Sequence, residues 1–218
     1  MRQNLEEVWE ASGREAEDPG LKQRYVQLPR LPVRLVVCPQ GKAVNQGGIV
    51  RIAEAYRVEH VAFMQEVENA VELSGSIGAW TWQSYSLGES DEALNQAISE
   101  GFTPVALNLS DRAVAVEQFE WTFPTVLVVG SEKSGVPGPM LSRCRAEIAI
   151  PMYGLVTSIN VASATAICLQ YAVQAYRRLD PNFLPARGRS KSLVNQRQGE
   201  LALGRPKHEA RGDAPDAG

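Results

Sequence analysis

A run of β-branched and apolar residues, Thr125-Val-Leu-Val-Val129, most constrains what this 218-residue chain can fold into. Polar and apolar residues do not alternate in it, so it predicts a strand that is buried on both faces of a sheet. Further strands are expected at 33–38, 60–64, 104–109 and 147–150, with helical segments between them. Strands that alternate with helices predict an α/β domain with a largely parallel sheet and helices on both faces.

Helical periodicity and capping signals fall between these strands. The clearest case is 90–101, which has a serine cap, acidic residues in its first turn and a glycine at its end. The longest helix is expected at 158–179. The remaining expectations are helices at 46–56 and 137–144, a weakly periodic helical stretch at 66–80, and a short strand at 81–86.

The net charge of −3 is unevenly distributed. From Arg177 to Arg211 the chain carries nine Lys and Arg residues but only three Asp and Glu residues. A basic tail on an acidic body indicates an anionic partner, although a merely solvated tail would have the same charge. We therefore divide the chain into an N-terminal extension with a short amphipathic helix (1–30), the α/β domain (31–180) and a basic, largely disordered tail (181–218).

Three further observations concern the compartment. No apolar run reaches the ~18 residues of a membrane span, and the N-terminus lacks a signal-peptide pattern. Cys38, Cys144 and Cys168 lie far apart, without the spacing of metal ligands, so we expect reduced thiols and no metal site. Together these features predict a cytoplasmic protein that does not associate with membranes.

Three loops follow predicted strands, where parallel sheets form their ligand sites. The first is Asn45-Gln-Gly-Gly-Ile-Val-Arg51, in which Asn45 can cap a helix and Arg51 follows nearly two turns later, close to the same face. The second is Gly130-Ser-Glu-Lys-Ser-Gly135, in which Glu132 can pair with a cation such as Arg51 or face water.

The third loop runs from Ile150 to Asn160. Pro151 and Gly154 break regular structure, and Ser158 and Asn160 then form a polar pair at the mouth of the long helix. Such a pair is a capping pattern, and the first amides of a helix can also hold a ligand. Taken singly, each of the three loops is better explained by capping or by a solvated surface charge than by a ligand site.

Taken together, the three loops resemble a known family. Asn45-x-Gly-x-x-x-Arg51, Gly130-Ser-Glu132-x-x-Gly135 and Ile150-Pro-Met-x-Gly154-x-x-x-Ser158-x-Asn160 resemble, in order, the three motifs of the SpoU/TrmH branch of the SPOUT RNA methyltransferases. The resemblance covers roughly 33–179, and it implies that 31–180 is a SPOUT methyltransferase domain whose C-terminal part forms a deep trefoil knot.

The resemblance also implies a cofactor and an assembly. The cofactor is S-adenosyl-L-methionine, and the residues that match the positions holding it are Gly130, Ile150, Leu155 and Ile159. Proteins of this family act as homodimers with the active site at the subunit interface.

The implied reaction is methyl transfer to the 2′-hydroxyl of a ribose in tRNA or rRNA. The residues at the catalytic positions are Arg51, Asn45, Glu132, Ser158 and Asn160. Arg51 has two possible roles. It is often described as the base that takes the ribose proton, but an arginine side chain stays protonated in proteins, and a neighbouring phosphate favours that form. A clamp on the phosphate that stabilises a developing alkoxide therefore remains an equal alternative.

RNA contacts are expected from the tail, through Arg187, Arg189, Lys191 and Arg197. The resemblance favours tRNA over rRNA, because the transfer RNA methyltransferases of this branch also have extensions at both ends. Two departures from the family pattern, Lys42-Ala-Val before Asn45 and Lys133-Ser134 in the second motif, bear on RNA preference. A non-catalytic RNA-binding dimer and an ordinary nucleotide-dependent α/β enzyme are the alternatives, and the second is weakened because the chain lacks a Walker or dinucleotide fingerprint.

Overall fold

The computed structural model describes residues 21–40, 42–64, 73–88, 91–187 and 201–202. The expected helix near the N-terminus, the start of the 66–80 helix, the Ser90 cap, and Arg189, Lys191 and Arg197 of the tail lie outside these residues. The described residues belong to two compact units. The larger unit runs from Pro29 to Phe183, and the domain boundaries expected from the sequence stay a prediction.

The smaller unit contains a short helix and a pair of strands. Helix α2 (Leu21–Val26) precedes the larger unit in the chain. Strands β8 (Ala186–Arg187) and β9 (Leu201–Ala202) follow it and pair in parallel.

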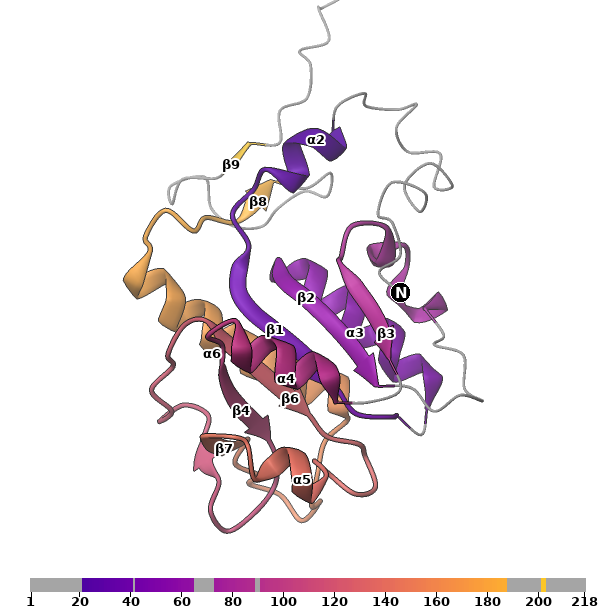
Figure 1. Ribbon diagram of the computed structural model, residues 1–218, viewed down its shortest axis with the longest axis vertical. Helices are drawn as coiled ribbons and strands as arrows, with labels where there is room; N and C mark the ends of the chain where they lie inside the picture. The colour runs from indigo at the N-terminus through magenta and orange to yellow at the C-terminus, as the bar shows by residue number, and fades with distance from the viewer. Residues whose placement is uncertain (1–20, 41, 65–72, 89–90, 188–200, 203–218) are drawn as a thin grey trace, which may run out of the picture. The chain divides into compact units, whose positions relative to one another are not determined.

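The larger unit is built on a seven-stranded sheet whose neighbouring strands are all parallel (Figure 1). The strand order is β3-β2-β1-β6-β4-β7-β5. In chain order the strands are β1 (Leu31–Val37), β2 (Val58–Met64), β3 (Tyr85–Gly88), β4 (Thr103–Leu107), β5 (Val114–Ala115), β6 (Thr125–Val129) and β7 (Ala146–Ala149). The predicted α/β domain with a parallel sheet is confirmed.

Strand β6 occupies the middle of this sheet, as its sequence predicts. All five of its residues are buried, and its side chains alternate between two separate cores. Leu127 and Val129 belong to one core, whereas Val126 and Val128 belong to the other. A strand with an apolar layer on each side has no face left for polar residues, which explains the unbroken apolar run.

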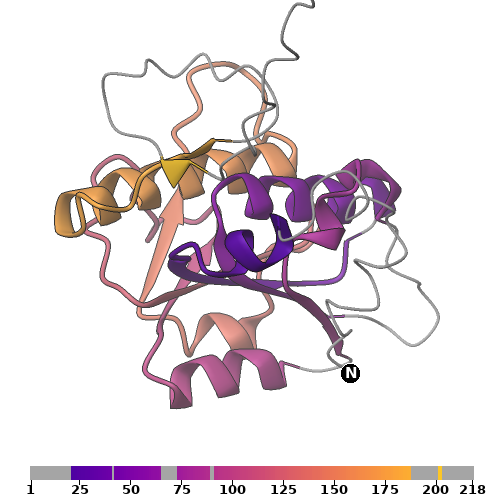
Figure 2. The ribbon, with the colours of Figure 1, turned by 90° about the horizontal axis from the view of Figure 1, so that it is seen from above.

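Helices cover both faces of the sheet (Figure 2). The core of Leu127 includes residues of α3 (Ala43–Ala55) and α6 (Val161–Leu179), which therefore lie on one face. The core of Val126 includes residues of α4 (Glu92–Ser99) and α5 (Gly138–Leu141), which lie on the other face.

The starts of the two helices nearest the motifs differ from expectation. Helix α3 begins at Ala43 rather than at residue 46, so Asn45 lies inside the helix and does not cap it. Helix α6 begins at Val161 rather than at residue 158, and its cap is Asn160, not Ser158. Because Asn45 does not cap α3, its side chain is available for the contacts described below.

Smaller corrections concern the segments around β3 and β5. The described part of the expected 66–80 helix forms two short 3-10 turns, Ser74–Ser76 and Ala79–Thr81, where glycines interrupt the helical pattern. Strand β3 starts at Tyr85 and not at residue 81. Strand β5 was not expected, because two residues are too few to give a recognisable pattern.

Two further expectations concern the thiols and the membrane. All three cysteines are free, and burial raises the pKa of the Cys38 and Cys144 thiols to about 11 and that of Cys168 to about 12. These thiols therefore stay protonated and unreactive at neutral pH. Within the described residues, no helix combines the length and the hydropathy that crossing a membrane requires.

The direction of the strands places the loops. Because the strands are parallel, their carboxyl ends meet at one edge of the sheet. The residues that leave this edge are Cys38 after β1, Asn108 after β4, Gly130 after β6 and Ile150 after β7. The three loops singled out in the sequence therefore meet at this edge, together with a fourth, the β4–β5 loop.

Candidate functional site

A chain of hydrogen bonds joins the three motif segments. The Asn45 side-chain amide donates from Nδ2 to Oε1 of Glu132 at 2.7 Å. Its Oδ1 accepts from Nδ2 of Asn160 at 2.9 Å. Asn45 is only 3% exposed, so both its donor and its acceptor are satisfied in a place that water barely reaches. Residues far apart in the sequence are thereby held in one orientation.

The last member of this chain also caps helix α6. Oδ1 of Asn160 accepts from the backbone amides of Ala162 at 2.9 Å and Ser163 at 3.2 Å. The cap therefore uses the oxygen of the Asn160 amide, which leaves the nitrogen to donate to Asn45. An ionised aspartate could accept the same amides but would have no hydrogen to donate to Asn45.

The structure does not bring all five expected catalytic residues together. Arg51 is exposed, whereas Asn45 is buried, so the two do not share a face of α3. Six residues of α-helix fall about 120° short of two full turns, which accounts for the difference. Arg51 forms no ion pair with another residue of the described chain, and Glu132 contacts Asn45 in its place. Ser158 is exposed in the loop before α6.

The loop after β6 is held by close backbone contacts. A Cβ on Gly130 would lie 2.4 Å from the carbonyl carbon of Gly135, so only glycine fits. Ser131 and Gly135 exchange backbone hydrogen bonds of 2.9 and 3.1 Å. Gln40, which sequence reasoning missed, donates from Nε2 to the carbonyl of Cys38 at 2.6 Å and to that of Gly130 at 3.1 Å. It thereby ties the end of β1 to the start of this loop.

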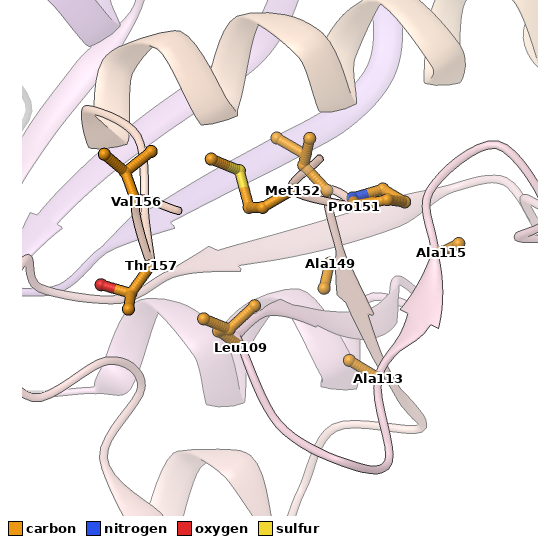
Figure 3. A pocket seen from close by; sticks show the side chains of 9 residues that line it. Leu109, Ala113, Ala115, Ala149, Pro151, Met152, Val156 and Thr157 are labelled. Atoms are coloured by element: carbon orange, nitrogen blue, oxygen red, sulfur yellow. The ribbon is translucent and has the colours of Figure 1, made fainter. Parts of the chain in front are cut away.

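A cavity of about 390 Å³ lies beside these segments (Figure 3). Its size falls within the usual range for a small-molecule site. Figure 3 shows side chains from the β4–β5 region and from the loop after β7 surrounding one space. The lining residues are Leu109, Ala113, Ala115, Ala149, Ile150, Pro151, Met152, Val156 and Thr157.

Only one of the four expected cofactor residues lines this cavity, namely Ile150. Gly130 is buried under its own loop, and Leu155 is fully exposed. The sequence reasoning missed the wall at Leu109 and Ala113, because it considered only the loops rich in glycine or asparagine. The signal was available, since the β4–β5 loop leaves the same edge of the sheet.

The comparisons with known proteins agree with this arrangement. The model of the SpoU rRNA Methylase family matches residues 32–170. The chain is 30% identical over 163 residues to the tRNA (guanosine(18)-2'-O)-methyltransferase of Escherichia coli strain K12, which is 71% of either chain. It is 31% identical over 136 residues to the enzyme of the same name from Aquifex aeolicus, covering 61% of this chain and 64% of that protein.

This chain belongs to the SpoU rRNA Methylase family. Solved structures have the same fold. The TrmH/SpoU tRNA modifying enzyme of A. aeolicus superposes with a TM-score of 0.67 at 25% identity, over 82% of this chain and 87% of that one. An AdoMet-bound rRNA methyltransferase from Sinorhizobium meliloti gives a TM-score of 0.60 at 21% identity, over 71% and 62%. The family membership inferred from the three motifs is thus confirmed.

The Gly130 contact leads to a stability prediction. Replacing Gly130→Ala should lower the free energy of unfolding by about 1–3 kcal/mol, because the added methyl overlaps the backbone at Gly135. The matched control is Gly138→Ala, since a Cβ there meets nothing within 4 Å. Urea unfolding of both variants measures the difference, and equal stability of the two would contradict the close packing of this loop.

Proposed function

We propose that this chain transfers a methyl group from S-adenosyl-L-methionine to a ribose 2′-hydroxyl of tRNA, at a guanosine. The observation that carries the proposal is the hydrogen-bond chain from Glu132 through Asn45 to Asn160, which joins the three family motifs at one edge of the sheet. The named tRNA (guanosine(18)-2'-O)-methyltransferases among the relatives support tRNA and guanosine.

The cavity beside the motifs suits the cofactor. Its lining is mostly apolar, with the Thr157 hydroxyl among the few polar groups, which fits a molecule that combines an adenine ring with a short aliphatic chain. Ile150, Leu109 and Val156 would hold it there, with backbone groups of the same loops. The cofactor supplies an already activated methyl group, so the protein has to align the hydroxyl and help its proton leave.

Arg51 is proposed as the residue that binds the RNA phosphate and stabilises charge on the ribose oxygen. Its side chain is exposed, and it has no acidic partner among the described residues to compete with a phosphate. The role of clamp therefore fits better than that of base. Asn45, Glu132 and Asn160 would hold the three motif segments together beside the cofactor cavity, and Ser158 would face the ribose.

A homodimer with the active site at its interface is part of the proposal. The site is bordered by exposed apolar side chains, which in a monomer would face water. The large apolar side chains exposed there are those of Val44, Tyr153, Leu155 and Val156. Burying such side chains stabilises association. The resemblance to the family also implies a trefoil knot in the C-terminal part of the domain, and a crystal structure traced through that part tests it.

The first prediction separates catalysis from folding. Arg51→Ala and Asn160→Asp should each lower the rate of methyl transfer to tRNA roughly 10²- to 10³-fold, measured with labelled S-adenosyl-L-methionine. Asn160→Asp keeps an oxygen to cap α6 but leaves Oδ1 of the buried Asn45 without its donor, so it should also lower the free energy of unfolding by about 1–3 kcal/mol. Asn160→Ala loses the cap as well, which should cost about a further 1 kcal/mol.

The control for these variants is Arg145→Ala. Arg145 is exposed like Arg51 but precedes β7, at the opposite edge of the sheet. Its removal should leave the rate within about twofold, as for a surface residue. Methyl transfer that survives Arg51→Ala would contradict the proposed site, and a wild-type protein that binds tRNA without turnover would favour a non-catalytic RNA-binding dimer.

A second prediction concerns the dimer. If Arg51 of one subunit serves the site of the other, mixing inactive Arg51→Ala and Asn160→Asp proteins should restore about a quarter of the wild-type rate. This value follows because half of the mixed dimers are hybrids, and each hybrid has one intact site. A mixture that stays inactive, or a monomer in sedimentation, would contradict a shared site.

A third prediction concerns the tail. We propose that the basic residues after 187 contact phosphates, so a chain that ends at Arg187 should bind tRNA more weakly. The slope of log affinity against log salt should fall by about one for each lost phosphate contact. The affinity for S-adenosyl-L-methionine serves as the control and should not change. An unchanged salt slope would leave the tail without an RNA role.

A further inference from the structure

A carboxylate in β7 lies at the centre of a second hydrogen-bond cluster. Oε2 of Glu147 accepts from Nδ2 of Asn108 at 2.8 Å and from the hydroxyl of Ser110 at 2.6 Å. Nε of Arg112 lies 3.8 Å from Oε1. The Glu147 side chain is only 11% exposed, whereas that of Arg112 is 85% exposed. The two short bonds therefore dominate, and the arginine adds a weak, screened attraction.

These contacts fix the β4–β5 loop, which forms one wall of the cavity. Asn108 and Ser110 flank Leu109, whose side chain lines the cavity in Figure 3. Ser110 also accepts from the Ala113 amide at 3.1 Å through its carbonyl, and Ala113 lines the cavity too. A short loop between two-residue and five-residue strands has few backbone bonds of its own, so its position depends on such side-chain anchors.

Glu147 also belongs to β7, the strand that leads into the opposite wall of the cavity. In β7 it is followed by Ile148, which pairs with Val114 of β5. Ala149, which ends β7, and Ile150, which follows it, line the cavity. Glu147 therefore joins the two walls, because its backbone belongs to β7 and its side chain is hydrogen-bonded to the β4–β5 loop. Glu147 could not be recognised from the three family motifs, because it precedes the third motif.

Asn108 extends the cluster to the loop after β6. A Cβ on Gly135, which has a φ of +65°, would lie 2.8 Å from Oδ1 of Asn108. Asn108 therefore packs directly against the end of the second motif. The loop after β6 is therefore bonded toward α3 through its own Glu132, and it contacts the Glu147 cluster through Asn108.

The Glu147 side chain is charged at neutral pH. The hydrogen bond from Ser110, then that from Asn108, lower the pKa of this carboxyl below its ordinary value of 4.5. Burial raises the pKa by less than either bond lowers it, and the nearby Arg112 lowers it by a still smaller amount. An ionised carboxylate only accepts hydrogen bonds, so the orientations of the Ser110 hydroxyl and the Asn108 amide are set. Bonds to a charged acceptor are also stronger than those to a neutral one.

We propose that Glu147 is a positioning residue for the cofactor, which acts by holding the Asn108–Ala113 loop against the S-adenosyl-L-methionine cavity. The proposal rests on the function proposed above. It assigns no contact between Glu147 and the cofactor, since Glu147 does not line the cavity. Its effect is on how well the wall is formed before the cofactor binds.

The test compares Glu147→Ala and Glu147→Gln with the wild type. Calorimetry with S-adenosyl-L-methionine alone should show roughly five- to twentyfold weaker binding to Glu147→Ala, because two bonds to a charged group are lost. In turnover assays the KM for the cofactor should rise by a similar factor, whereas kcat and the KM for tRNA should stay within about twofold. Glu147→Gln keeps an acceptor oxygen and should bind between the two.

Hydrogen exchange supplies a readout that does not depend on turnover. The backbone amides of 109–113 should exchange faster in Glu147→Ala, and the amides of β6 should not change. The matched control is Glu117→Ala, since Glu117 is an exposed acid that follows β5 and does not itself line the cavity. It should leave both affinity and exchange unchanged.

Three outcomes decide the proposal. Weaker cofactor binding with faster exchange in 109–113 supports it. Wild-type binding by Glu147→Ala, with the wild type active, overturns it and leaves the proposed methyltransferase function intact. A wild-type protein that neither binds S-adenosyl-L-methionine nor transfers a methyl group overturns both, so the two failures are distinguishable.

Discussion

The structure of the site depends on one buried amide. Asn45 is held inside α3, and its side chain can be satisfied only by a donor on one side and an acceptor on the other. Asn160 supplies the donor from the start of α6, and Glu132 supplies the acceptor from the loop after β6. Leaving either group of a buried amide unpaired costs free energy, so the three segments are constrained to meet.

The parallel sheet makes this meeting possible. Loops from β1, β4, β6 and β7 leave one edge, and the central loop after β6 meets two networks there: its Glu132 accepts from Asn45, and its Gly135 packs against Asn108. Glu132 fixes the loop toward α3, the helix whose exposed Arg51 carries the positive charge proposed to bind RNA. Glu147 fixes the side toward the cavity. Binding of the cofactor and binding of the RNA would thus be prepared by two separate networks that share one glycine-rich loop.

The sequence predicted the features that depend on local pattern. The apolar run at 125–129 gave the central strand, and the ordered motifs gave the family. It failed where a tertiary contact decides the role of a polar residue. Asn45 looked like a cap, yet it lies inside α3 and bonds across to two other segments, and of the two expected caps of α6 only Asn160 acts as one. The partners of a single amide cannot be inferred from spacing along the chain.

The lining of the cavity is a second case in which the sequence pattern was not sufficient. Its wall at Leu109 comes from small and apolar residues, which carry no chemical signal in the sequence and become a site only when β5 pairs with β7. Gln40 and Glu147 were missed for the same reason, because their importance lies in the carbonyls and donors they reach. Residues of this kind are visible only once the strand order is known.

The central claim is that this site methylates a ribose hydroxyl and not a base. The most direct measurement is nucleoside mass spectrometry of tRNA after incubation with the purified protein and S-adenosyl-L-methionine. The account predicts one new 2′-O-methylguanosine per tRNA. A methyl group found on a base, or tRNA that gains no methyl group at all, would contradict it.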